Sequence, residues 1–276
     1  MTQQDGKILV GGNFQSYNGE LTKFITRLNV DGSEDTSFNT GLGPDNRIKT
    51  ISVLPNDRII IGGEFFNYDG QAVEGIARLN ADGTLDTNFN MFGTGFSGIG
   101  IVNTTAVQSD GKIVIGGLFN TYNGVNTNRI ARLNSDGSLD SSFTIGTGAN
   151  NTVLAIALQQ NGKIIVGGAF TLFNGVSSNK IVRLNENGSI DTSFSTGIGF
   201  DFQVFSIQIQ DDGKIIVGGT FSSYNGTNAK RIIRLNPDGS IDTSFNVGEG
   251  ANISVNTISI QNDGKIILGG NFNTFQ

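Results

Sequence analysis

A motif of about 51 residues recurs along the whole chain, and it constrains the fold more than any other feature. A pair of glycines, followed by one residue and Phe, occurs six times, and the pairs begin at Gly11, Gly62, Gly116, Gly167, Gly218 and Gly269. The triplet Arg-Leu-Asn recurs five times with the same spacing and begins at Arg27, Arg78, Arg132, Arg183 and Arg234. A period of this length, built from short apolar strands, is typical of a β-propeller with four-stranded antiparallel blades.

The fifth repeat shows the four strands, which we name A to D. Alternating or β-branched apolar residues predict them at 204–209, 214–221, 230–236 and 240–245. Asp212-Gly213 is a hairpin turn between strands A and B. Gly218 and Gly219 in strand B should allow a close backbone approach or a bulge. Five complete sets predict an all-β, five-bladed propeller that forms one domain over residues 1–276. Because residues 259–276 repeat residues 1–18, an open or overlapping ring is the alternative.

The turn between strands C and D sets the register of that hairpin. Pro237-Asp238-Gly239 suits a three-residue loop with glycine in the left-handed region, so Arg234 should face Asp242. A buried charge is costly without a partner, so an Arg and an Asp that recur together should form an ion pair. The equivalent pairs are Arg27–Asp35, Arg78–Asp86, Arg132–Asp140 and Arg183–Asp191.

The repeat resembles known propeller families. The Gly-Gly at the end of strand B resembles kelch repeats, with Phe where kelch repeats usually have Trp. The fuller pattern is Asp-Gly-Lys-Ile-Ile-Val-Gly-Gly-x-Phe followed by Arg-Leu-Asn-x-Asp-Gly-Ser-Ile-Asp-Thr-Ser-Phe. This pattern closely resembles the delta-60 repeat family of bacterial β-propellers over the whole chain. The resemblance implies the fold; that family is mostly of unknown role and often occurs within large surface-associated proteins.

Composition excludes several classes of function. The formal net charge of −6 and scattered basic residues argue against nucleic acid as a partner. Without His or Cys, the chain has neither a Ser-His-Asp nor a Cys-His triad. No apolar run is long enough to span a bilayer, and the N-terminus lacks the pattern of a signal peptide. We therefore expect no membrane insertion, no cofactor and no enzymatic activity.

The turn between strands C and D also invites a comparison with calcium loops. Its pattern Asn-x-Asp-Gly-Ser-x-Asp is rich in oxygen atoms, for example at Asn236, Asp238 and Asp242. Calcium needs six to eight oxygen ligands from a defined loop, and this spacing does not match the EF-hand pattern. We interpret the motif as a hairpin turn with its Arg–Asp pair, and we expect no metal.

The loops between strands B and C carry an aromatic residue directly before Asn-Gly or Asp-Gly. These residues are Tyr17, Tyr68, Tyr122, Phe173 and Tyr224. Five rings on one face of a propeller could stack on sugars, as in lectins that bind one sugar per blade. The alternative is that each ring packs beneath its own loop. Phe173 favours this alternative, because Phe takes the place of Tyr there and an apolar packing role needs no hydroxyl group.

The D–A loops, which lead from one repeat into the next, depart most from the repeat. The loop after Phe89 has a three-residue insertion, and the loop at 200–203 reads Phe-Asp-Phe-Gln. Departures from a repeat on one face are where specific function tends to lie. The candidates for a contact patch are Phe92, Phe96, Phe200 and Phe202.

The sequence therefore predicts a non-enzymatic structural or interaction module of a bacterial or bacteriophage surface or particle protein. Its partner would be a protein or glycan on the face of the B–C and D–A loops, and a lectin-like propeller is the alternative. The location would be the cell surface if the chain is part of a longer secreted protein, and the virion if it is phage-encoded. A hydrolase would need two suitably placed acids. The acids outside the repeat are Glu64, Glu74, Asp201 and Glu249, and the sequence places no partner beside them.

Overall fold

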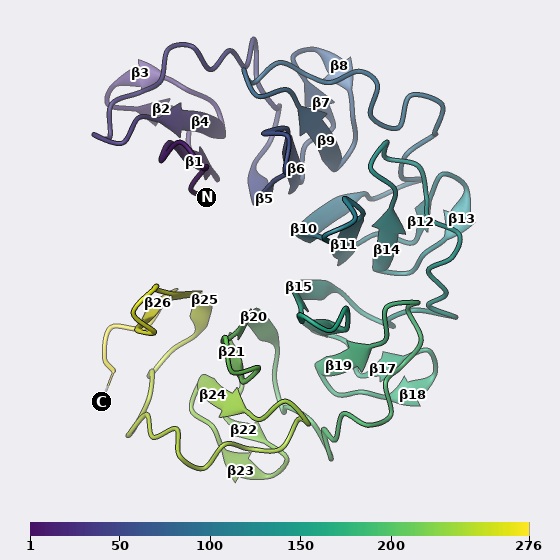
Figure 1. Cartoon of the computed structure of the whole chain (residues 1–276), viewed down its shortest axis with the longest axis vertical. Coiled ribbons are helices and arrows are strands. Elements are labelled where there is room, and N and C mark those ends of the chain that lie inside the picture. Colours follow the sequence, from purple (N-terminus) through teal and green to yellow (C-terminus); the bar gives the residue numbers. More distant parts are fainter. Residues whose placement is uncertain (276) are drawn as a thin grey trace. The chain divides into compact units, whose positions relative to one another are not determined.

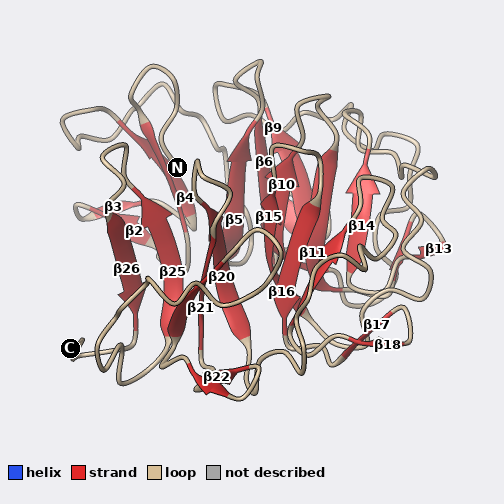
Figure 2. Ribbon diagram, turned by 60° about the horizontal axis from the view of Figure 1, so that its bottom comes forward, coloured by secondary structure: helices blue, strands red, loops and turns tan. Residues whose placement is uncertain are grey.

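The structure is a computed structural model that describes residues 1–275, and all regular elements in this range are β-strands (Figure 2). The all-β expectation is confirmed. By their contacts the residues divide into two compact units, Met1–Asp140 and Ser141 onward, which we describe one at a time. The expectation of one domain over residues 1–276 stays a prediction, and residue 276 lies outside the described residues.

Apart from small two-stranded hairpins, the first unit contains three main antiparallel sheets, one per repeat (Figure 1). In the second and third sheets, strands A, B and C are hydrogen-bonded in that order, and the first sheet consists of strands B and C. Strand A of the second repeat lies beside strand A of the third. The three sheets are β1 (Ile8–Gly11) with β4 (Ile25–Leu28); β5 (Ile48–Val53), β6 (Ile59–Gly63) and β9 (Ile76–Leu79); and β10 (Ile101–Val107), β11 (Ile113–Leu118) and β14 (Ile130–Leu133).

The second unit repeats this plan in three further sheets. Two of them have strands A, B and C, and the third consists of strands A and B. Its three A strands follow one another side by side. The sheets are β15 (Val153–Leu158), β16 (Ile164–Gly168) and β19 (Ile181–Leu184); β20 (Val204–Ile209), β21 (Ile215–Gly219) and β24 (Ile232–Leu235); and β25 (Val255–Ile260) with β26 (Ile266–Gly270).

The Gly-Gly pair allows strand B to approach a β-bulge in strand A. In β15 the register with β16 shifts between Val153 and Ala155, and the same shift recurs in the other A strands. A Cβ added to Gly168 would collide with the carbonyl oxygen of Thr152, which is backbone and cannot move aside. Both expectations for the Gly-Gly pair, a close approach and a bulge, are confirmed, and the bulge belongs to strand A.

The C–D turn has the expected register, although strand D is shorter than expected. An isolated bridge joins Leu235 to Ile241, and Gly239 lies at φ +92°. This register places Arg234 opposite Asp242, as a three-residue loop requires. Beyond the bridge the chain turns away, so the main sheet has three hydrogen-bonded strands and D contributes a single bridge. The outer edge of strand C is therefore only partly covered.

The B–C connection is a small hairpin, where the sequence suggested only a polar loop. Its turn is Asn-Gly or Asp-Gly, as at Asn123 (φ +49°) and Gly124 (φ +76°), and two left-handed residues in succession are typical of a tight hairpin turn. The hairpins are β2 (Ser16–Tyr17) with β3 (Glu20–Leu21); β7 (Asn67–Tyr68) with β8 (Gln71–Ala72); β12 (Thr121–Tyr122) with β13 (Val125–Asn126); β17 (Leu172–Phe173) with β18 (Val176–Ser177); and β22 (Ser223–Tyr224) with β23 (Thr227–Asn228).

The apolar core lies between successive sheets within each unit. One cluster joins Ile165 and Ile181 of one sheet to Val204, Ile207 and residues of the next. Strand B is buried on both faces, as its continuous run of β-branched residues predicts. Burial of this apolar surface against the next sheet stabilises each repeat through its neighbour.

Candidate functional site

The ion pairs predicted between the repeated Arg and Asp residues are confirmed, and they form a structural network. The Arg Nε donates to an Asp oxygen at 2.6–2.8 Å in all five repeats. In the fourth repeat, Asp191 also accepts from Lys163 Nζ at 2.7 Å and from the Ser193 hydroxyl at 2.7 Å. Burial alone would raise the pKa of Asp191, but the hydrogen bonds from Lys163, Ser193 and Arg183 hold it well below its usual range.

The same arginine also joins one repeat to the next, which sequence reasoning missed. Arg183 donates to the carbonyl oxygen of Pro237, in the next C–D turn, and its guanidinium lies 4.6 Å from the centre of the Phe194 ring. Arg27 makes the corresponding bond to Ala81 at 2.5 Å in the first unit. These contacts explain why Arg, Asp and the final Phe of the motif recur together.

The aromatic residues of the B–C hairpins are buried, which corrects the interpretation of a sugar-stacking ring. Tyr68, Tyr122 and Phe173 have no exposed surface, and Tyr224 is 1% exposed. The hydroxyl groups of the tyrosines donate to glycine carbonyls of the C–D turn, for example from Tyr122 to Gly137 at 2.8 Å. A sugar cannot stack on a covered ring.

Tyr17 is the least covered member of this set. It is half-buried, and its hydroxyl donates to the carbonyl of Gly32 at 2.8 Å. Packing beneath the loop, the alternative drawn from Phe173, is therefore what the structure shows for four of the five rings.

The hairpins instead hold the D–A loops in place. The side-chain oxygen of Asn123 accepts from the Gly95 N–H at 2.8 Å, and Asn225 accepts from Ile198 in the same way at 3.1 Å. From the other side, Asp201 accepts from the N–H groups of Ser222 and Ser223 at 2.9 and 3.0 Å. Within each unit, the D–A loops and B–C hairpins therefore lie on one common face, which we call the loop face of that unit.

Asp201 is itself part of the repeat, contrary to the sequence interpretation. Asp45, Asn150 and Asn252 occupy the equivalent position and accept from the same two backbone groups of their hairpins. The exchange of Asp for Asn hides this repeat, because both side chains offer the same acceptor. Only the placement of the loops reveals that they share a role.

Of the four D–A loop phenylalanines, the structure buries two and exposes two. Phe96 and Phe200 are 5% and 2% exposed and pack against the ring of the next hairpin, with ring centres 5.0 Å apart for Phe96 and Tyr122 and 4.5 Å apart for Phe200 and Tyr224. Phe92 is 94% exposed and Phe202 59% exposed. The contact patch predicted from these residues is thus reduced to Phe92 and Phe202.

The three-residue insertion presents Phe92 from an anchored loop. Asn90 N–H donates to the carbonyl of Asp136 at 2.7 Å, and Asn90 and Asn123 exchange side-chain hydrogen bonds. Met91 and Phe92 follow Asn90 directly, and their exposed side chains line a cavity of about 490 Å³. A loop fixed at both ends presents these side chains at little entropic cost to a partner.

Most exposed large apolar side chains of the described chain belong to the loop face. They come from D–A loops and B–C hairpins in both units, whereas the A–B turns are polar. Single exposed apolar residues are common on natural surfaces, but here they are concentrated in one set of loops. They are Leu21, Leu42, Phe66, Met91, Phe92, Ile99 and Val125 in the first unit, and Leu172, Val176, Ile198, Phe202, Ile253 and Phe275 in the second.

Several acidic residues outside the Arg–Asp pairs have hydrogen-bond or ion-pair partners of their own. Among residues 1–275, no group of three or more Asp and Glu side chains could hold a metal ion. In the C–D turn, Asp238 Oδ1 accepts from both the backbone N–H and the hydroxyl of Ser240. Glu64 is paired with Arg47 and Lys49. None of residues 1–275 forms a helix that is long and apolar enough to cross a membrane.

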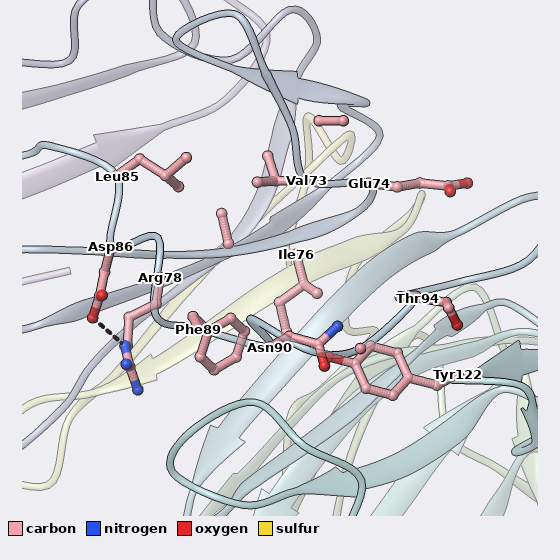
Figure 3. Close-up of a pocket in the computed structure, with 14 residues that line it drawn as sticks. Val73, Glu74, Ile76, Arg78, Leu85, Asp86, Phe89, Asn90, Thr94 and Tyr122 are labelled. Carbon is pink, nitrogen blue, oxygen red and sulfur yellow. Dashed lines mark hydrogen bonds and ion pairs between the residues drawn. The ribbon is translucent and has the colours of Figure 1, made fainter.

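Glu249 and Glu74 differ from these acids in their surroundings. Glu249 forms an ion pair with Lys230. Burial raises the pKa of Glu74, and a hydrogen bond from the backbone of Gly100 opposes that rise. Glu74 lines a cavity of about 240 Å³ beside β9 (Figure 3).

Comparison with known families agrees with the repeat. A family model described as "Domain of unknown function (DUF5122) beta-propeller" matches residues 3–38, 54–89, 108–143, 159–194, 210–245 and 261–276. Five of the matched segments run from just before strand B to the end of strand D, and the sixth covers 261–276. The matches omit the A strands and most of the D–A loops. No curated protein matches the sequence significantly.

Solved structures with a similar fold include several β-propellers. Streptogramin B lyase is 17% identical, with a TM-score of 0.56 over 97% of this chain and 74% of that one. The WD40 propeller domain of Doa1 is 16% identical, with a TM-score of 0.56 over 89% and 68%. PorZ, from Porphyromonas gingivalis, is 11% identical, with a TM-score of 0.54 over 97% and 36%. At these identities the likeness shows the fold alone.

Proposed function

The chain belongs to the DUF5122 β-propeller family, and on that premise we propose that it is a non-catalytic interaction module that binds a protein through its loop face. We include in this proposal that its repeats are of the delta-60 type and that the parent protein acts on a bacterial surface or in a phage particle. PorZ, which shares the fold, is described as an essential bacterial surface component of a secretion system.

One observation carries the proposal: the residues of the repeat are occupied in packing, and the exposed apolar residues gather on the loop face. The Arg–Asp network is saturated by its own partners. The family model omits most of the D–A loops, and in these loops Met91 and Phe92 stand exposed. Exposed aromatic and Met side chains on a rigid base are typical of protein-binding surfaces.

A photo-crosslinking experiment in cells that express the protein naturally tests the proposal. The photoreactive residue p-benzoylphenylalanine replaces Phe92 in one variant and Asp110 in the control. Asp110 lies in an exposed A–B turn at the opposite end of the strands. We expect a discrete cross-linked protein from position 92 and none from position 110. Equal labelling from both positions, or none from position 92, would refute a partner that covers the D–A loop around Phe92.

The structure leaves fewer exposed aromatic residues for the lectin-like alternative than the sequence predicted. Of the five B–C loop aromatics on which it was based, four are buried and Tyr17 is half-buried; Phe92 and Phe202 of the D–A loops are the exposed rings in the whole predicted contact set. A glycan array tests it directly. Specific binding to one glycan class that is lost in Phe202→Ala would favour the alternative over a protein partner.

A further inference from the structure

A groove on the loop face of the second repeat is lined in part by an acidic side chain, Glu74. Its volume is about 240 Å³, and it lies between the start of β9 and the D–A loop at 89–95. Figure 3 shows the Arg78–Asp86 pair at one end of the view and Glu74 at the other. Its apolar wall is formed by Val73, Ile76, Leu85 and Phe89.

The groove is a product of the repeat, because a smaller one occupies the equivalent place in the first repeat. That cavity has about 190 Å³ and is lined by residues that include Thr22, Lys23, Ile25 and Phe38, which correspond to Val73, Glu74, Ile76 and Phe89. Both grooves arise where segment D leaves strand C after one bridge. They differ in charge, since Lys23 stands where the second groove has Glu74.

The floor of the groove is an uncovered backbone edge. Gly63 donates to the carbonyl of Gly75, so Gly75 and Ala77 face β6 and the residue between them, Ile76, faces the groove. Two residues further along β9, the hydrogen bond from the Asp86 N–H to the Arg78 carbonyl covers the edge of the strand. The N–H and carbonyl of Ile76 are thus directed toward the cavity, as in an edge strand that can accept another strand.

Glu74 gives this groove a negative charge that nothing else in it balances. None of the ion pairs formed by residues 1–275 includes Glu74, and Arg78 and Asp86 neutralise each other at 2.8 Å. The other repeats have Lys23, Asn128, Asn179 and Lys230 at this position. A half-buried carboxylate without a cation is a cost to the folded protein that a cationic ligand would remove.

We propose that this groove binds an extended peptide segment of the partner, with a lysine or arginine side chain directed at Glu74. The inference rests on the proposed function and specifies its partner. The peptide backbone pairs with the N–H and carbonyl of Ile76, which is the β-augmentation mode of peptide recognition. The aliphatic part of the basic side chain covers Val73, and its cationic group meets the carboxylate. The volume limits the contact to about two or three peptide residues.

Two blocked pentapeptides serve as probes: Ac-Thr-Val-Lys-Val-Thr-NH2 and the same peptide with Glu in place of Lys. Each is titrated into the ¹⁵N-labelled protein, and backbone amide shifts are followed by NMR. We expect saturable shifts at Ile76, Ala77 and the loop at 93–95 with the lysine peptide. The glutamate peptide should bind at least about tenfold more weakly, since one favourable charge contact is worth about 1.4 kcal/mol. Shifts elsewhere, or equal shifts with both peptides, would overturn the proposal.

Two variants separate charge recognition from general effects. Glu74→Gln should weaken the lysine peptide at least about fivefold, and the matched control Glu20→Gln, an exposed acid on a hairpin of the same unit, should leave it unchanged. N-methylation of successive peptide residues should weaken binding at alternate positions, because an edge strand bonds alternate residues. Uniform loss along the peptide would contradict backbone pairing.

The outcomes for the groove and for the loop face are distinguishable. A cross-link from position 92 together with no saturable peptide shift refutes the groove and leaves the protein-binding module standing. Peptide binding at Ile76 without any cross-link supports the groove as a peptide site and refutes the larger contact surface around Phe92.

Discussion

Removal of Asp191 tests whether the repeated ion pair stabilises the fold in the way the structure indicates. The side chain of Arg183 is 6% exposed and would lose its bond to Asp191 Oδ2, now 2.6 Å long. Removing one partner of a buried pair costs about 3–5 kcal/mol, because the remaining charge stays buried. Arg183 would keep its bond to the Pro237 carbonyl and its contact with Phe194. We therefore expect Asp191→Ala to lower the free energy of unfolding by about 2–4 kcal/mol.

The matched control is Lys163→Ala, which removes the second cation of the same carboxylate. The side chain of Lys163 is 29% exposed, so its ion pair with Asp191 resembles a surface ion pair. Such a pair contributes about 0.2–1 kcal/mol to the free energy of unfolding. Urea unfolding followed by far-UV circular dichroism measures both variants. A cost for Asp191→Ala no larger than that for Lys163→Ala would refute the argument from burial.

A double variant distinguishes a lost attraction from an uncompensated charge. Arg183→Met with Asp191→Leu removes both charges and leaves apolar side chains in their place. If the cost of Asp191→Ala comes from the unpaired guanidinium, the double variant should be the more stable of the two. A double variant as unstable as Asp191→Ala, or less stable, would show that the attraction itself carries the stability.

Three further outcomes are expected. Gly168→Ala should lower the free energy of unfolding by at least about 2 kcal/mol, because the added Cβ would collide with the Thr152 carbonyl. Gly12→Ala should be nearly neutral, since its Cβ would meet only Phe14 at 3.5 Å. Equal urea midpoints for the two variants would contradict this. The free energy of unfolding should fall as the pH is lowered below about 4, because carboxyl groups such as that of Asp191 have lower pKa values in the native state than in the unfolded chain, and the native state therefore binds fewer protons. Asp191→Asn should make this fall smaller in urea midpoints measured from pH 7 to pH 2. Tyr224→Phe should cost about 1 kcal/mol in the same assay, because the Gly239 carbonyl loses a buried donor; a cost near zero would show that the hydroxyl is dispensable.

Much of the blade could be predicted from the sequence because its determinants are local. The alternation of apolar residues indicated strands A to C, and Pro237-Asp238-Gly239 predicted the loop that places Arg234 opposite Asp242. The Gly-Gly pair predicted a close approach of two backbones. In each case the relevant partners lie within one hairpin or recur with the repeat, so the spacing of residue types is enough to infer them.

Strand D shows where local patterning stops being sufficient. The residues after the C–D turn alternate as a strand would, yet pairing ends after the bridge between Leu235 and Ile241. Asp242 turns its side chain to Arg234, and Phe245 packs its ring against the same guanidinium at 4.6 Å. These contacts compete with continued pairing, and they involve a cation whose burial depends on the next repeat.

The candidate site was decided by tertiary structure. Phe92 and Phe96 lie in one short loop and look alike in the sequence, but Phe96 packs against Tyr122 of the next hairpin and Phe92 has no such partner. Glu74 became a candidate only when β9 and the following D–A loop enclosed it in a groove. The sequence by itself determined the repeat, the strands and the C–D register, because turn chemistry and side-chain alternation act over a few residues. Exposure and the groove's charge balance were decided only by the fold, because both depend on side chains tens of residues away that packing alone brings together.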